Sequence, residues 1–136
     1  MRICIAYSSL KSNKVENYAR ALGKGIEEQS NAVIDIVDID KESEKRLTGY
    51  NYIIFGTSKN SLFSVKLNKS FSNFLKNCGH LSGKHTFAYT NKSFRSHKFL
   101  SNIMSELERQ GVLLKSSAVI TSKEQAKVIG SKLHLK

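Results

Sequence analysis

Apolar residues follow two alternating patterns along this chain. Unbroken apolar runs at residues 3–6 and 52–55 indicate strands that are covered on both faces. Between such runs, apolar residues three and four positions apart indicate amphipathic helices. The expected strands span residues 3–7, 32–38, 52–55, 85–89 and a part of 112–120. The expected helices carry their apolar stripes over residues 15–26, 67–78, 99–107 and 126–133.

Polar residues and glycines mark the ends of these elements. Asn13 is placed to cap the first helix, and Gly79 and Gly111 are placed to end the second and third. Ser122 precedes Gln125 by three positions, which is a capping-box spacing before the last helix.

The alternation of strands and helices predicts one α/β domain over residues 1–136. Strands joined by helices form a parallel sheet with helices on both faces. Five such units fit a three-layer sandwich with a five-stranded parallel sheet of order 2-1-3-4-5. Asp35 and Asp38 interrupt the second strand, which suits the edge position that this order gives it.

Composition narrows the class of protein. The chain has 136 residues, of which 40% are hydrophobic and 24% charged, as in globular domains. No apolar run approaches the roughly 20 residues of a membrane span, and the chain starts on a strand-like segment rather than a leader. We therefore expect a cytoplasmic protein without membrane contact. Cys78 and His80 have no second pair at metal-binding spacing, so no metal site is expected.

The net charge of +11 is unevenly distributed. Residues 1–68 carry 10 Lys or Arg against 8 Asp or Glu, whereas residues 69–136 carry 12 against 3. A basic half of this kind suggests an anionic partner, which is an acidic protein, nucleic acid or a phosphorylated ligand. A solvated lysine-rich surface is the alternative interpretation.

The predicted topology locates the chemistry. Open parallel sheets bind ligands beyond the carboxyl ends of their strands, at the switch point between the first and third strands. Three loops, at residues 8–14, 57–66 and 90–98, should meet there, and their lysines and arginine predict an electropositive crevice. The candidate binding residues are Ser8, Ser9, Lys11, Ser12, Asn13, Lys14, Thr57, Ser58, Lys59, Asn60, Thr90, Asn91 and Phe94.

The chain resembles the flavodoxin family over essentially its whole length. The matching segments are Tyr7-Ser8-Ser9 with Asn13 and Ala19, Tyr52-Ile53-Ile54-Phe55-Gly56-Thr57, and Leu81-Ser82-Gly83-Lys84. The resemblance implies a flavodoxin-like fold and an FMN cofactor. In that family the first loop wraps the FMN phosphate with hydroxyls and backbone N–H groups at a helix N-terminus. The other two loops hold the isoalloxazine ring, usually between aromatic side chains.

The sequence also departs from the family pattern. The family loop reads Ser-x-Thr-Gly-x-Thr, and its last four positions are Lys11, Ser12, Asn13 and Lys14 here, without the glycine and both threonines. Asn60 stands where a ring-stacking aromatic is common, and Phe63 and Phe94 are the nearest substitutes. Flavodoxin surfaces are commonly acidic, whereas this chain is basic.

Two classes of function follow. The first is FMN-dependent electron transfer through an atypical basic cofactor site, with an acidic redox partner protein. The alternative is a binding module on the same fold that has lost FMN and binds an acidic protein, nucleotide or nucleic acid. An accessory domain of a larger redox complex is a third option. The chain contains no Gly-x-Ser-x-Gly, P-loop or Gly-x-Gly-x-x-Gly motif, so a carrier or binding protein is expected rather than a stand-alone enzyme.

Overall fold

Strands and helices alternate along the chain in the computed structural model, which describes residues 1–8 and 13–135. Within that part of the chain, no helix combines the length and apolar character needed to cross a membrane. The elements are β1 (Arg2–Ser8), α1 (Lys14–Gln29), β2 (Val33–Asp38), β3 (Tyr52–Thr57), α2 (Lys69–Asn77), β4 (His85–Asn91), α3 (Ser96–Arg109), β5 (Leu113–Ile120) and α4 (Lys123–Lys132).

The five strands form one parallel sheet of order β2-β1-β3-β4-β5. The predicted order is confirmed, and the polar second strand lies at an edge. In the centre of the sheet, Ser8 of β1 is in register with Thr57 of β3, and Gly56 of β3 is in register with Tyr89 of β4. The carboxyl ends of these three strands therefore finish at the same level, which brings the loops after β3 and β4 to the end of β1.

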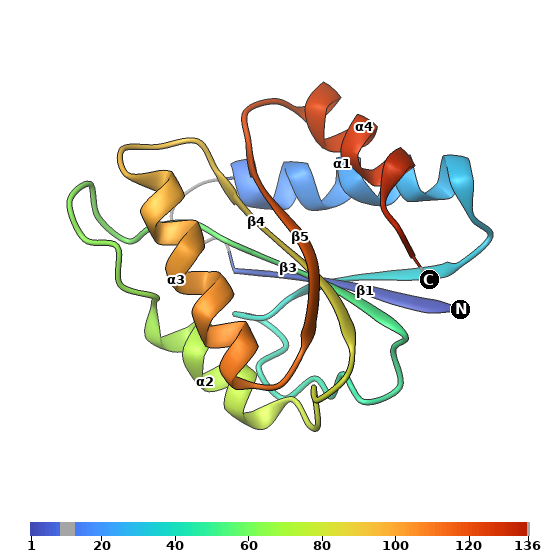
Figure 1. Cartoon of the computed structure of the whole chain (residues 1–136), viewed down its shortest axis with the longest axis horizontal. Coiled ribbons are helices and arrows are strands. Elements are labelled where there is room, and N and C mark those ends of the chain that lie inside the picture. Colours follow the sequence, from blue (N-terminus) through green and yellow to red (C-terminus); the bar gives the residue numbers. More distant parts are fainter. Residues whose placement is uncertain (9–12, 136) are drawn as a thin grey trace.

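Two layers of helices cover the sheet, with α1 and α4 on one face and α2 and α3 on the other (Figure 1). Side chains of a strand alternate between faces, so one run serves both cores. Ile3 and Ile5 of β1 pack in the core with α1 and α4, whereas Cys4 and Ala6 pack in the core with α2 and α3. This double burial explains why the central strands are continuously apolar.

The helix ends follow the sequence signals with one exception. Gly79 and Gly111 adopt positive φ angles of 100° and 84° after α2 and α3, as expected of helix-ending glycines. Ser122 Oγ accepts a hydrogen bond from the Gln125 backbone N–H at 3.1 Å and caps α4. Asn13 does occupy the N-cap position of α1, but its side chain makes no capping hydrogen bond because its backbone is already helical, at φ −76° and ψ −3°.

Two glycines allow α1 and α4 to pack in close contact. A Cβ atom on Gly25 of α1 would overlap the Lys127 carbonyl oxygen, and a Cβ atom on Gly130 of α4 would overlap the Leu22 carbonyl oxygen. At this crossing the two helices touch backbone to backbone. Gln29 reinforces the contact, because its side-chain amide donates to the carbonyl oxygens of Gly130 at 2.7 Å and Leu133 at 3.1 Å.

Candidate functional site

The carboxyl end of β1 and the loops after β3 and β4 lie at one edge of the sheet, on the left in Figure 1. The structure thus places Ser8, Thr57 and Thr90 at neighbouring strand ends. Ser9, Lys11 and Ser12 lie outside the described residues. The remaining candidates form three groups, at the ends of β1, β3 and β4. The groups differ in which of their side chains already make hydrogen bonds within the protein.

Ser8 at the end of β1 is buried and held by a carboxylate. Its hydroxyl donates to Asp40, with Oγ 3.0 and 3.1 Å from the two carboxylate oxygens. A serine hydroxyl has one hydrogen, so while this bond persists Ser8 Oγ has no proton to donate to an anion. Asn13 and Lys14 are exposed at the start of α1. Asp40 is a member of this site that sequence reasoning did not single out.

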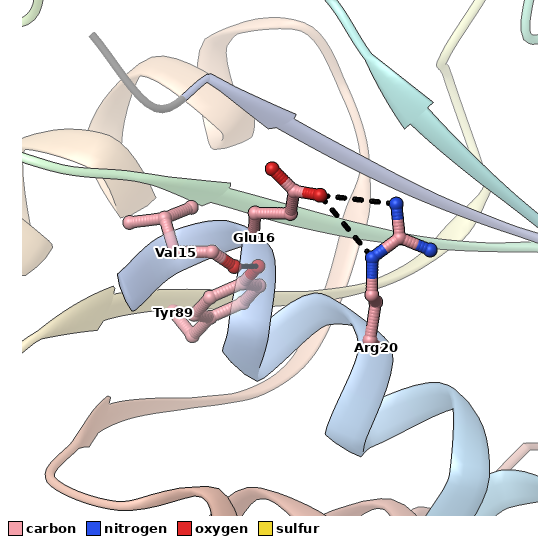
Figure 2. Close-up of polar contacts among 4 residues, drawn as sticks. All are labelled: Val15, Glu16, Arg20 and Tyr89. Carbon is pink, nitrogen blue, oxygen red and sulfur yellow. Dashed lines mark hydrogen bonds and ion pairs between the residues drawn. The ribbon is translucent and has the colours of Figure 1, made fainter. Parts of the chain in front are cut away.

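The first turn of α1 is anchored to β4 through a buried tyrosine (Figure 2). The Tyr89 hydroxyl donates to the Val15 carbonyl oxygen at 2.8 Å, and burial raises the pKa of Tyr89 well above its usual 10.0. The ring lies over Gly56, where any Cβ atom would overlap it. Glu16 of the same turn forms an ion pair with Arg20 at 3.0 Å. Packing and one hydrogen bond therefore fix the direction in which α1 starts.

Thr57 at the end of β3 is tied to the start of α2. The Asn68 side-chain amide donates to Thr57 Oγ1 at 3.0 Å. Asn68 Oδ1 also caps α2, because it accepts from the Phe71 backbone N–H at 2.8 Å. Ser58 is buried, and Asn60 is exposed. The loop between Thr57 and Asn68 thus leaves and re-enters the fold at two linked, buried positions.

The loops after β3 and β4 contact each other through aromatic and basic side chains. The rings of Phe63 and Phe94 meet edge to face, with centroids 5.9 Å apart and an interplanar angle of 80°. Lys59 Nζ donates to the carbonyl oxygens of Leu62, at 2.7 Å, and of Phe94, and it lies 5.6 Å from the centroid of the Phe94 ring. Arg95 Nη1 donates to the Phe63 carbonyl oxygen at 3.4 Å. The cations of these loops therefore also hold the loops together.

Unpaired polar atoms gather at the end of β4. Within the described part of the chain, four buried side-chain atoms have no hydrogen-bond partner, namely Tyr52 Oη, Thr90 Oγ1, Asn91 Oδ1 and Ser96 Oγ. Three of the four belong to the end of β4 or the first residue of α3. Each such atom costs about 1–3 kcal/mol if it stays unpaired. Successive residues of a strand face opposite sides of the sheet, so Thr90 Oγ1 and Asn91 Oδ1 are separate candidates for a polar ligand, one on each face.

The positive charge expected along the whole edge is concentrated on one side of it. On the β1–β2 side stand the carboxylates of Glu16, Asp38 and Asp40. The β3 and β4 loops belong to a stretch, residues 45–105, that contains no Asp or Glu at all. The loops after β3 and β4 therefore carry cations without carboxylates, whereas the β1–β2 side carries charges of both signs.

The cysteines and histidines do not add a second site. Among the described residues, no group of three or more His, Cys, Asp or Glu side chains is arranged to hold a metal ion. Burial raises the pKa of Cys4 to about 12 and that of Cys78 to about 11, so both remain thiols at neutral pH. A neutral buried thiol is a poor nucleophile.

Comparison with solved structures assigns the architecture. An oxidised flavodoxin 1 from Bacillus cereus matches with a TM-score of 0.77 and 19% sequence identity, over 96% of this chain and 95% of that one. The chain has the flavodoxin fold. A flavodoxin from the domain Archaea matches with a TM-score of 0.71 at 18% identity, over 96% and 94% of the two chains. The two-electron reduced flavodoxin of Megasphaera elsdenii matches with a TM-score of 0.70 at 14% identity, over 93% and 96%.

Comparisons of the sequence alone give no match. No family model matches the chain, and no curated protein matches it. Among these comparisons, the similarity to flavodoxins thus comes from the arrangement of the elements. The unpaired atoms of Thr90, Asn91 and Ser96 and the Phe63–Phe94 pair lie at the edge where this fold class binds its ligands.

Proposed function

We propose that this protein binds FMN at the carboxyl edge of its sheet and carries electrons to a partner protein. The proposal rests on one observation above all, the unpaired buried atoms of Thr90, Asn91 and Ser96 at the same edge of the sheet as two exposed aromatic rings. A flavin ring has a polar edge that donates and accepts hydrogen bonds and two apolar faces. The polar atoms at the end of β4 and the rings of the loops after β3 and β4 suit the two parts of such a ring.

The chain's own residues would divide the work of binding. Asn91 Oδ1 can accept a hydrogen bond, whereas the hydroxyls of Thr90 and Ser96 can donate or accept. Phe63 and Phe94 offer apolar surface for the ring faces. The N-terminus of α1 offers partial positive charge to a phosphate. Bound FMN would supply reversible transfer of one or two electrons, and the protein would set its orientation and polarity.

The experiment is a titration of the purified protein with FMN, followed by flavin absorbance and by quenching of flavin fluorescence. We expect saturable binding of one FMN per chain. The Asn91→Ala variant should weaken binding by about 2- to 13-fold, because one charge-neutral hydrogen bond is worth about 0.5–1.5 kcal/mol. The matched control is Asn77→Ala, at an exposed position near the end of α2, and it should bind FMN as the parent does.

A second candidate function is a binding module on this fold without FMN. Ser8 is held by Asp40, and Glu16 lies in the first turn of α1, so negative charge stands near the place where the family binds phosphate. Like charges disfavour a phosphate dianion there. Colourless protein that shows no saturable FMN binding would favour this function over the first.

A further inference from the structure

Three exposed apolar side chains lie side by side on the loops after β3 and β4. Leu62, Phe63 and Phe94 are 59%, 73% and 54% exposed. The contact between the two rings and the bonds from Lys59 to the carbonyls of Leu62 and Phe94 join them into one surface. We refer to these three residues as the apolar patch. Exposed apolar patches with polar rims mark interaction sites in soluble domains.

The charged residues around the apolar patch, on the loops after β3 and β4 and the first turn of α3, are all basic. Lys59 and Arg95 bond directly to its backbone. Lys66 and Lys92 are exposed on the same two loops, and Lys98 is exposed in the first turn of α3. No carboxylate occurs in the sequence between Glu44 and Glu106. An apolar centre inside a rim of one sign has the anatomy of a protein interface that selects a partner of opposite charge.

We propose that the apolar patch and its basic rim dock an acidic surface of a partner protein. A protein fits better than nucleic acid for two reasons. Leu62 has no ring, so one of the three residues of the apolar patch offers a base no stacking surface but can pack against apolar side chains of a protein. In addition, Lys59 and Arg95 direct donors to carbonyl oxygens of the loops and keep fewer for phosphates. The claim that electrons pass to the partner at this surface rests on the proposed function. The claim that a partner docks here does not require a bound flavin.

The test uses a short synthetic peptide, rich in glutamate and containing leucine and phenylalanine, as a probe of the partner chemistry. Isotope-labelled protein is titrated with this peptide at low ionic strength, and backbone NMR shifts report the binding position. We expect saturable shifts at Leu62, Phe63, Phe94 and their neighbours, and an affinity that falls as salt is added. A peptide with lysine in place of each glutamate serves as the probe control.

Two double variants separate local charge from net charge. Lys66→Glu with Lys92→Glu reverses the rim and should weaken the acidic peptide about tenfold or more at low salt. Lys115→Glu with Lys132→Glu makes the same change in net charge near the start of β5 and the end of α4, toward the opposite edge of the sheet. This control should change the affinity less than about twofold. Phe63→Ser should weaken binding while leaving its salt dependence in place.

Three results would overturn the proposal. They are shifts spread over the whole surface, an equal loss of affinity in both double variants, or displacement of the peptide by single-stranded oligothymidylate from the same residues. The FMN titration of the same samples is a separate readout. Peptide binding without FMN binding would support the docking surface and contradict the electron-carrier function. FMN binding without peptide binding would support FMN as the cofactor and contradict the docking surface.

Discussion

Replacement of Gly56 by alanine tests the packing beneath the candidate site. Gly56 lies in β3, in register with Tyr89 of β4, and a Cβ atom there would overlap the tyrosine ring. The ring has no exposed surface, and its hydroxyl is bonded to Val15 at 2.8 Å. It therefore has no free direction in which to move without loss of that hydrogen bond.

The expected cost has two parts. Overpacking a dense core costs about 1–3 kcal/mol. Displacement of the Tyr89 hydroxyl would leave the buried Val15 carbonyl oxygen unpaired, which costs about 1–3 kcal/mol more. We therefore expect Gly56→Ala to lower the free energy of unfolding by about 3–5 kcal/mol. Because urea m-values for small proteins are about 1–3 kcal/mol/M, the urea midpoint should fall by more than about 1 M.

A double-mutant cycle identifies the cause. Tyr89→Val removes the ring, so Gly56→Ala in that background meets open space and should cost less than about 1 kcal/mol. The coupling energy between positions 56 and 89 should then be at least about 2 kcal/mol. Equal costs of Gly56→Ala in both backgrounds would refute the explanation, because the overlap would then not be with Tyr89.

Three further predictions concern other parts of the molecule. Gly130→Ala should lower the free energy of unfolding by about 1–3 kcal/mol, because its Cβ atom meets the Leu22 carbonyl oxygen of α1; urea denaturation measures this, and an unchanged midpoint would show that the helices can separate freely. Arg95 has φ 58°, a left-handed conformation that costs a non-glycine residue about 1–2 kcal/mol, so Arg95→Gly should be more stable than Arg95→Ala by about 1 kcal/mol. Both variants lose the same side-chain hydrogen bond, and equal stability would contradict the strain. Burial raises the pKa of Cys4 from 9.0 to about 12, so the unfolded chain loses the thiol proton first and stability should fall as pH rises above 9.0 toward 12. At pH 8, a thiol-specific dye should react with neither cysteine of the native protein and with both in urea; rapid reaction of the native protein would show that the core opens.

The sheet was predictable because its central strands are buried on both faces. A short, continuous apolar run in such a chain indicates a buried strand. The helical stripes between these runs indicated that the strands are joined by helices and therefore run parallel. The residues at which the strands end were harder to predict. β3 extends to Thr57 and β4 to Asn91, because backbone pairing continues past the last apolar residue into polar positions that the hydrophobic pattern does not mark.

The site was predictable where topology decides it and not where loop conformation does. Thr57 and Thr90 were found because parallel strands end at one edge. Asp40 follows from the same order, since β2 lies beside β1, but the sequence offers no sign that its carboxylate bonds Ser8. The bond from Asn68 to Thr57 depends on how the intervening loop folds back, which no periodicity encodes. The unpaired hydroxyl of Ser96 was not predictable either, because it depends on the conformation of the turn at Arg95.

The backbone contact between α1 and α4 has a consequence for the order in which this protein can mature during synthesis. β1 and α1 leave the ribosome first, but the partner that covers Gly25 on α1 is α4, about a hundred residues later in the chain. Until residues 123–132 emerge, the surface of α1 that α4 covers is open to solvent and chaperones. A nascent chain stalled before α4 should therefore be cleaved by protease at α1. Once α4 has emerged and packed against α1, this cleavage should stop.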